Sequence, residues 1–281
     1  YNVFFQTSLS PKTSIMLEGR YTESEQGDLP LRFPLNGRDN FSVNRRKDRD
    51  EKSVRVGMRH AFSPRSQIIS HATYVSSEES IHDMFGPNPI DVILDDSASM
   101  VEAQHLINGD YFDLTSGIGH FDRDRERTQK FIGKITTELN VTHTNLYIYS
   151  QISYPSNFTW TIGGSADFYD DDEAKDRDQF NPKFGLSVTP FAGTTLRAAV
   201  FRTVKRSLAG RQTIEPTQVA GFNQFFDDLN GAKSWRYGLA IDQTISPNIH
   251  GGIEYSRRDI VSTMTNTRSF EMEDGDWNES L

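Results

Sequence analysis

Apolar and polar residues alternate along much of this chain, and the alternation is clearest between residues 144 and 169. The first half of this stretch has Leu146, Ile148, Ile152 and Tyr154 on one face, and Asn145, Tyr147, Tyr149, Gln151 and Ser153 on the other. After Pro155-Ser156, the second half has Phe158, Trp160, Ile162, Gly164, Ala166 and Phe168 on one face. A period of two residues predicts β-strands. Runs of about 12 residues exceed ordinary strands and are long enough for the about 9–11 residues of a tilted membrane strand.

The same alternation predicts further strands along the chain. It is clear at 15–22, 54–59, 184–189, 235–245 and 249–256, and weaker at 3–9, 67–76, 101–107, 112–121 and 196–205. Together these segments predict about 12 strands, since each run holds the period of two that strands require. In the run 196–205, Arg197 and Arg202 cannot face the same side of an unbroken strand, so a bulge is expected there.

Tight turns and long polar segments divide these runs in a regular order. Turns are predicted at Ser10-Pro11, Ser63-Pro64, Tyr154-Pro155, Thr189-Pro190, Ser246-Pro247 and Asn108-Gly109. Long charged loops are predicted at 23–52, 77–100, 122–141, 170–181, 206–232 and from 261 onward. Short turns at one end and long loops at the other are typical of outer-membrane barrels, with the short turns in the periplasm. The predicted fold is an all-β, up-and-down antiparallel transmembrane β-barrel.

Composition agrees with a barrel in lipid. The chain has 281 residues, a net charge of -9 and 25% charged residues, and its mean hydropathy is -0.60. Only every second residue of a membrane strand faces lipid, so low hydropathy does not exclude the membrane. The absence of cysteine excludes a disulfide framework, and the acidic balance argues against a nucleic-acid partner. We expect residues 1–281 to be one barrel domain, a fragment of a longer chain whose complete barrel has about 14–18 strands, because an open edge is costly in lipid.

The polar face holds the candidate site residues. About a dozen strands enclose a lumen too wide for side chains to fill, so the apolar face should point to lipid and the polar face inward. The predicted lumen-facing residues are Glu18, Arg20, Arg55, Arg59, Asp167, Arg236, Asp242, Glu254 and Arg258. Charged groups in a lumen can select solutes, or they can pair across neighbouring strands. Pairing is the favoured interpretation, and Arg236 with Glu254 is one possible pair.

Other motifs carry little chemistry. The acidic run Asp170-Asp171-Asp172-Glu173 offers oxygen ligands for calcium but lacks the spacing of a known calcium loop. The mixed runs 45–50 and 122–127 contain arginines that can bind lipopolysaccharide phosphates. A solvated surface loop is the favoured interpretation of all three. The seven histidines form no metal motif and no nucleophile motif occurs, so we predict no enzyme, no metal and no cofactor.

One segment carries a resemblance to known families. Residues 212–228 and 234–238, with 241–243 and 251–259, resemble the C-terminal barrel of bacterial outer-membrane proteins that carry an N-terminal tetratricopeptide-repeat region. The layout also resembles the barrels of TonB-dependent receptors and porins. The stronger similarity covers about residues 190–260. The resemblance implies a location in the bacterial outer membrane, and relatives with this domain order include export porins for exopolysaccharides.

The sequence thus predicts an outer-membrane channel, or an export or uptake porin, with a polar lumen. Phe222, Phe225 and Phe226 are too apolar for a freely solvated loop, so we expect their segment to fold onto the rim or into the lumen as a constriction. The alternative is a structural or surface-interaction barrel that acts as an anchor, assembly partner or phage receptor. The expected partners are outer-membrane lipid, lipopolysaccharide and periplasmic or envelope proteins.

Overall fold

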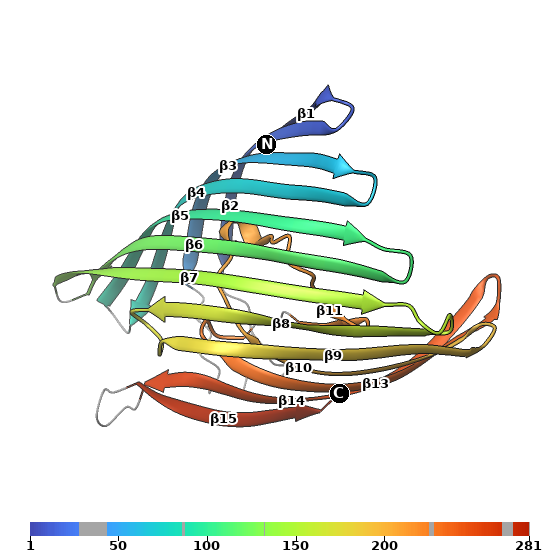
Figure 1. Cartoon of the computed structure of the whole chain (residues 1–281). Helices are drawn as coiled ribbons and strands as arrows, with labels where there is room; N and C mark the ends of the chain where they lie inside the picture. Colours follow the sequence, from blue (N-terminus) through green and yellow to red (C-terminus); the bar gives the residue numbers. More distant parts are fainter. Residues whose placement is uncertain (28–43, 86–87, 132, 225–227, 266–271, 281) are drawn as a thin grey trace.

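Thirteen antiparallel strands form one curved sheet in which each strand pairs with the next along the chain (Figure 1). The computed structural model describes residues 1–27, 44–85, 88–131, 133–224, 228–265 and 272–280. The strands are β1 (Asn2–Ser10), β2 (Thr13–Gly27), β3 (Arg46–Ser63), β4 (Ser66–Phe85), β5 (Asn88–Asn108), β6 (Phe112–Lys130), β7 (Lys134–Ile152), β8 (Phe158–Asp171), β9 (Arg177–Phe191), β10 (Thr194–Val204), β13 (Lys233–Ser246), β14 (Ile249–Thr265) and β15 (Met272–Ser280). Among these described strands β1 and β15 are the two edges and do not pair with each other, so the sheet is open.

The predicted fold class is confirmed. Six connections of two to five residues lie at one end of the sheet, at 11–12, 64–65, 109–111, 153–157, 192–193 and 247–248. Proline lies in or next to the turn at four of the five X-Pro pairs, but Pro190 still belongs to β9. The turn after it is made by Ala192 and Gly193, where Gly193 has a φ of 80°.

Most of the predicted long loops are strand instead. β4 continues to Phe85 and β5 begins at Asn88, so 77–100 is nearly all sheet, and β6 and β7 fill most of 122–141 in the same way. Most of 170–181 also belongs to β8 and β9, while residues 28–43 of the first predicted loop lie outside the described part. Both faces of these strand extensions carry polar residues, so the alternation that marks a half-buried strand is missing.

Two further expectations about the C-terminal half are wrong. The chain after residue 261 is not only a loop, because β14 continues to Thr265 and β15 returns beside it, with Ile260 opposite Trp277. No bulge separates Arg197 from Arg202, because β10 pairs with β13 without a register shift, and the two arginines simply lie on opposite faces. The shift present in β10 lies at its start, against β9.

The two faces of the sheet differ in chemistry. We call the face that contacts residues 205–224 the inner face, and Figure 1 shows β11 (Gln218–Val219) of this segment on the hollow side of the sheet. The outer face carries an apolar belt, and the ten belt residues named next are each 46–62% exposed. The belt includes Leu17, Val56, Tyr74, Val101, Ile118, Ile148, Ile162, Phe184, Leu239 and Tyr255. Such a belt is the surface that outer-membrane barrels present to lipid.

No helix in the described ranges has both the length and the hydropathy needed to cross a membrane.

Candidate functional site

Between β10 and β13, residues 205–224 and 228–232 fold back against the inner face, and we call these described residues the inner loop. It contains a short 3-10 helix, η1 (Ala209–Arg211), and a small hairpin of β11 and β12 (Phe222–Asn223). Its base is closed by the amide of Lys205, which donates to the carbonyl of Ala232 at 2.7 Å. Ala209 is buried in an apolar cluster with Met100, Phe121 and Tyr169 of the wall.

A carboxylate of the wall holds the first part of the loop. Both oxygens of Glu102 on β5 accept hydrogen bonds from the loop, from the Thr213 hydroxyl at 2.5 Å and the Ile214 amide at 2.9 Å. His71 lies 2.8 Å from Glu102 on the wall side. Gln104 donates to the carbonyl of Ile214 at 2.6 Å. A backbone amide and carbonyl of the loop are therefore satisfied by wall side chains, as buried backbone groups require.

A buried ion pair holds the second part. Arg206 and Glu215 both belong to the loop, lie 2.7 Å apart, and each expose 4% of their side chains. The Glu215 carboxylate also accepts hydrogen bonds from Tyr149 at 2.7 Å and Asn145 at 2.9 Å. Burial alone lowers the pKa of Arg206, but the charges of Glu215, Asp167 and Glu102 raise it above its usual value. Arg206 therefore remains a cation, compensated by carboxylates from both loop and wall.

The hairpin rests on two glycines of the wall. A side-chain carbon added at Gly238 would lie 2.4 Å from the ring of Phe222, and one added at Gly185 would lie 2.8 Å from Ala220. The Phe222 ring is fully buried and lies beneath two guanidinium groups, 5.1 Å from Arg197 and 5.6 Å from Arg236. A side chain at either position would overlap the hairpin, so glycine is what lets Phe222 and Ala220 lie against the wall.

The hairpin turn itself is made by Ala220 and Gly221, with φ of 48° and 84°. Two consecutive positive φ values are those of a type I′ turn, which favours asparagine and glycine and joins two-residue hairpins. Arg197 donates to the carbonyl of Ala220 at 3.3 Å, and Arg236 donates to the carbonyl of Asn223 at 2.8 Å. The wall arginines thus bind the hairpin through its backbone as well as its ring.

The structure places all nine predicted lumen residues on the inner face, in several groups. Asp242 and Glu254 pair with the two arginines that contact the hairpin, with Arg197–Asp242 at 2.6 Å and Arg236–Glu254 at 3.1 Å. Glu18, Arg20 and Arg55 form a second group on β2 and β3, in which Glu18 lies 3.0 Å from Arg20 and 3.4 Å from Arg55. Arg59 is exposed and donates to Gln67 at 2.7 Å. Arg258 pairs with Glu279 at 3.1 Å and with Asp228 of the loop.

The predicted pairing of Arg236 with Glu254 is confirmed, although the two are not directly opposite. Arg236 faces Arg258 across the strands, and Glu254 faces Ala240, so the pair is diagonal. Asp167 is separate from these groups and buried, where it accepts hydrogen bonds from His143 at 2.9 Å and Asn181 at 2.6 Å. Phe225 and Phe226 lie outside the described residues.

Sequence reasoning missed the residues that hold the loop most tightly. Glu102 lies in a strand, 101–107, whose alternation of apolar and polar residues is weak. Its position on the polar, inward face was the one feature of the sequence that could have marked it as a contact of the loop. Arg206 and Glu215 belong to the loop and are nine positions apart, and no local pattern joins them. Gly185 and Gly238 alternate with apolar belt residues, which marks them as inward but not as contacts.

The other predicted motifs lie in or beside strands. Within the described residues, no three histidine, aspartate or glutamate side chains are grouped so as to hold a metal. In the acidic run, Asp171 accepts a hydrogen bond from the amide of Glu173 at 2.8 Å. The arginines of the mixed runs pair with carboxylates, Arg49 with Glu51 at 2.6 Å, and Arg125 with Asp96 at 2.6 Å.

Comparison with known proteins identifies the fold. No protein-family model matches the chain, and no curated protein matches it. Among solved structures, the ferric citrate transporter FecA aligns at 11% identity with a TM-score of 0.68, over 99% of this chain and 46% of FecA. The alcaligin outer-membrane receptor FauA from Bordetella pertussis aligns at 13% identity and 0.61, over 99% and 47%. The FpvAI–pyocin S2 complex aligns at 10% identity and 0.63, over 100% and 48%.

The chain therefore has the fold of outer-membrane receptor barrels and spans about half the length of these structures. These solved structures agree with the expected resemblance to TonB-dependent receptor barrels. They do not support the expected resemblance to barrels of proteins that carry tetratricopeptide repeats. The apolar belt on the outer face, together with this fold, indicates a location in the bacterial outer membrane.

Proposed function

We propose that this chain forms part of the wall of an outer-membrane uptake barrel, and that the inner loop occludes part of its passage. The observation that carries the proposal is the inner loop itself. It leaves the wall after β10 and binds back to the inner face through Glu102, Tyr149, Arg197 and Arg236. A loop that closed only the outer rim would not need this continuous set of contacts along the wall.

The transported solute is proposed to be polar and bulky. The inner face presents both signs of charge. Arg59 on β3 is exposed, while Arg20 on β2, Asp242 on β13 and Glu254 on β14 are half-exposed. Rings of mixed charge suit a solute that carries carboxylates and a bound cation. Ferric citrate, the ligand named for FecA, belongs to this class. Uptake is favoured over export of a polysaccharide, because the solved structures with this fold include a transporter and a receptor.

The test compares two glycine substitutions in the full-length protein reconstituted in planar bilayers. Gly238→Val inserts a side chain where Phe222 packs, while Gly19→Val has nothing within 4 Å of the added carbon and serves as the matched control. Gly238→Val should displace the hairpin and raise single-channel conductance above wild type, and Gly19→Val should not. Equal conductance in all three proteins would contradict occlusion by the loop. Uptake of radiolabelled ferric citrate by cells carrying each protein tests the solute class separately.

One observation favours the alternative, a surface-interaction barrel. Strands β4, β5, β6 and β7 have 20, 21, 19 and 19 residues. At about 3.3 Å per residue they measure roughly 65 Å, while the apolar band of such barrels is about 25 Å tall. The excess forms a charged wall outside the membrane that a protein can bind, as pyocin S2 is bound in the FpvAI complex. Lipopolysaccharide and periplasmic proteins are further proposed partners.

A protein that stays silent in bilayers even after the inner loop is displaced would support this alternative over transport. The readout is the Gly238→Val conductance, combined with hydrogen exchange of the loop amides to show that displacement has occurred.

A further inference from the structure

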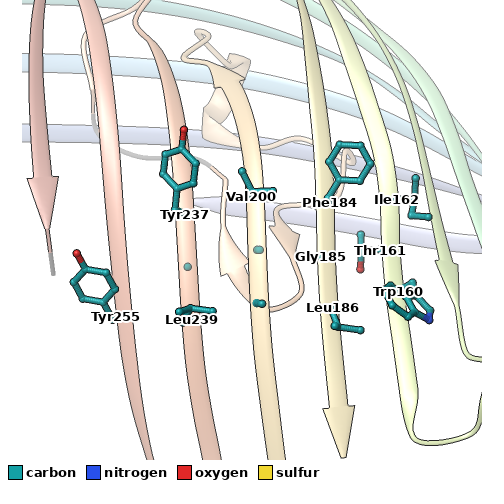
Figure 2. Close-up of a pocket in the computed structure, with 13 residues that line it drawn as sticks. Trp160, Thr161, Ile162, Phe184, Gly185, Leu186, Val200, Tyr237, Leu239 and Tyr255 are labelled. Atoms are coloured by element: carbon teal, nitrogen blue, oxygen red, sulfur yellow. The ribbon is translucent and has the colours of Figure 1, made fainter.

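An apolar groove runs along the outer face over β8, β9, β10, β13 and β14 (Figure 2). Its volume is about 540 Å³, within the roughly 300–1,000 Å³ range of ligand sites. Large side chains border it, Trp160 and Phe184 on one side and Tyr237 and Tyr255 on the other, and Figure 2 shows them around the smaller Val200 of β10. The belt is therefore hollowed here, because small residues of β10 lie between rows of aromatic ones.

Two arginines lie on the same face, Arg202 at the loop end of the groove and Arg257 at its side. Arg202 follows Val200 by two positions on β10, and Arg257 follows Tyr255 by two positions on β14. Two strand residues measure roughly 7 Å, so Arg202 lies just beyond the end of the groove. Arg257 is level with Val200 and Tyr237 in the strand register, so it lies at the side of the groove. Arg202 lies over the ring of Trp235, at 6.0 Å from its centroid. Tryptophan at this level is typical of the interface between hydrocarbon and head groups.

The charges at this end favour an anion. Within the described parts of the chain no carboxylate pairs with Arg202, which instead contacts the Trp235 ring. Arg257 donates through Nε to Asp259 at 2.9 Å, and the two side chains remain 51% and 43% exposed. Asp259 orients Arg257, and together the three side chains leave one net positive charge next to the hydrocarbon boundary.

We propose that this groove binds one lipopolysaccharide molecule, with an acyl chain in the groove and a phosphate of its lipid A on Arg202 and Arg257. The proposal rests on the proposed function, in that the barrel lies in the outer membrane with its loop end facing outward. A guanidinium group presents paired N–H donors that match a phosphate, while the groove excludes water from the chain beside it. A phosphorylated, multiply acylated lipid of the outer leaflet satisfies both halves of the site.

The test measures radiolabelled lipopolysaccharide retained by the purified full-length protein in detergent. Arg202→Gln/Arg257→Gln removes the phosphate contacts, and Lys12→Gln/Arg65→Gln removes two positive charges in the short turns as the matched control. Ala198→Phe fills the groove, and Ala72→Phe adds the same ring elsewhere on the outer face. Retention of lipopolysaccharide should fall about tenfold in Arg202→Gln/Arg257→Gln and in Ala198→Phe. It should stay at the wild-type level in Lys12→Gln/Arg65→Gln and in Ala72→Phe.

Unchanged retention in Arg202→Gln/Arg257→Gln or in Ala198→Phe would overturn the site. Equal competition by phosphatidylglycerol vesicles would also overturn it, because the groove would then take phosphorylated lipids without distinction. Cell fractionation separates this failure from that of the proposed function. A protein found in the outer membrane with unchanged retention refutes only the groove, while a protein found elsewhere refutes both.

Discussion

Replacing Glu215 with glutamine should release the inner loop from the wall, because the change removes the nearest counter-charge of the buried Arg206. The side chains of this pair are 2.7 Å apart and each is 4% exposed. Glutamine keeps the shape and can still accept a hydrogen bond from Tyr149 or Asn145, so the charge is the main difference. Removing one partner of a buried ion pair typically costs about 3–5 kcal/mol.

The cost should appear as local opening of the loop, since the strands of the wall keep their own ladder of hydrogen bonds. At about 1.4 kcal/mol per factor of ten, the open fraction of the loop should rise by roughly two to four orders of magnitude. Hydrogen exchange reads this directly at the amides of Ile214 and Gln224, which donate to Glu102 at 2.9 Å and to the carbonyl of Thr217 at 2.9 Å. Their protection should fall by the same factor.

Glu279→Gln is the matched control, because Glu279 is 47% exposed in its pair with Arg258. Arg258 keeps a second carboxylate partner, Asp228, when Glu279 is neutralised, so loop protection should remain near wild type. The double change Arg206→Met/Glu215→Leu should recover much of the protection, since it removes both charges together. Equal protection in Glu215→Gln and Glu279→Gln would refute the view that the buried pair holds the loop.

Three other groups of residues carry predictions of their own. Ala220→Gly should stabilise the hairpin by up to about 1–2 kcal/mol, because alanine is strained at a φ of 48°. Gly221→Ala should destabilise it, because it places alanine at a φ of 84°. Denaturant titration of each variant measures the change in the free energy of unfolding. Asp95→Asn should raise the melting temperature at low salt, and less at high salt. Asp95 is part of a row of carboxylates directly opposite one another on β2 to β7, namely Glu23, Asp50, Glu78, Asp95, Glu126 and Glu138. Asp274 lies on β15 beyond the apolar belt, and the hydrogen bond from Arg177 lowers the pKa of its carboxyl. The pair therefore stabilises the fold fully above the ordinary pKa of 3.8, and this stabilisation is lost as pH falls through the lower pKa of the folded state. Asp274→Asn should abolish this loss of stability at acid pH, which a series of melting temperatures against pH measures.

The sequence predicted the sheet well where water touches only one face. At β7 and β8 the outward residues Leu146, Ile148 and Ile162 alternate with polar inward ones, and the observed pairing places all three on the belt. The same reasoning failed in the extensions of β4 to β7, where Asp124 on one face and Arg125 on the other both meet polar surroundings. A strand whose two faces are both exposed to water carries polar residues on both and shows no alternation of apolar and polar residues. These charged segments were therefore predicted to be loops.

The candidate site could be predicted only as far as contacts between neighbouring strands. Arg236 and Glu254 belong to one hairpin, and their pairing followed from the alternation of that hairpin. Glu102 and Thr213 are 111 residues apart, and their contact exists only because the sheet curves and the loop enters its hollow side. Hydrophobicity correctly marked Phe222 as a residue that would not stay in water, yet the ring does not face a passage.

Phe222 instead fills the space that Gly238 leaves beneath Arg197 and Arg236, so its role is to attach the loop. The attachment of the hairpin depends on the wall more than on the loop sequence. The hairpin supplies one ring and one turn, while the wall beside it supplies two glycines and two guanidinium groups. Small changes in the curvature of β9, β10 and β13 would separate these groups from the hairpin together, because Gly185, Arg197 and Arg236 contact it from three different strands. A solute that altered the spacing of these strands would therefore weaken all the hairpin contacts at once.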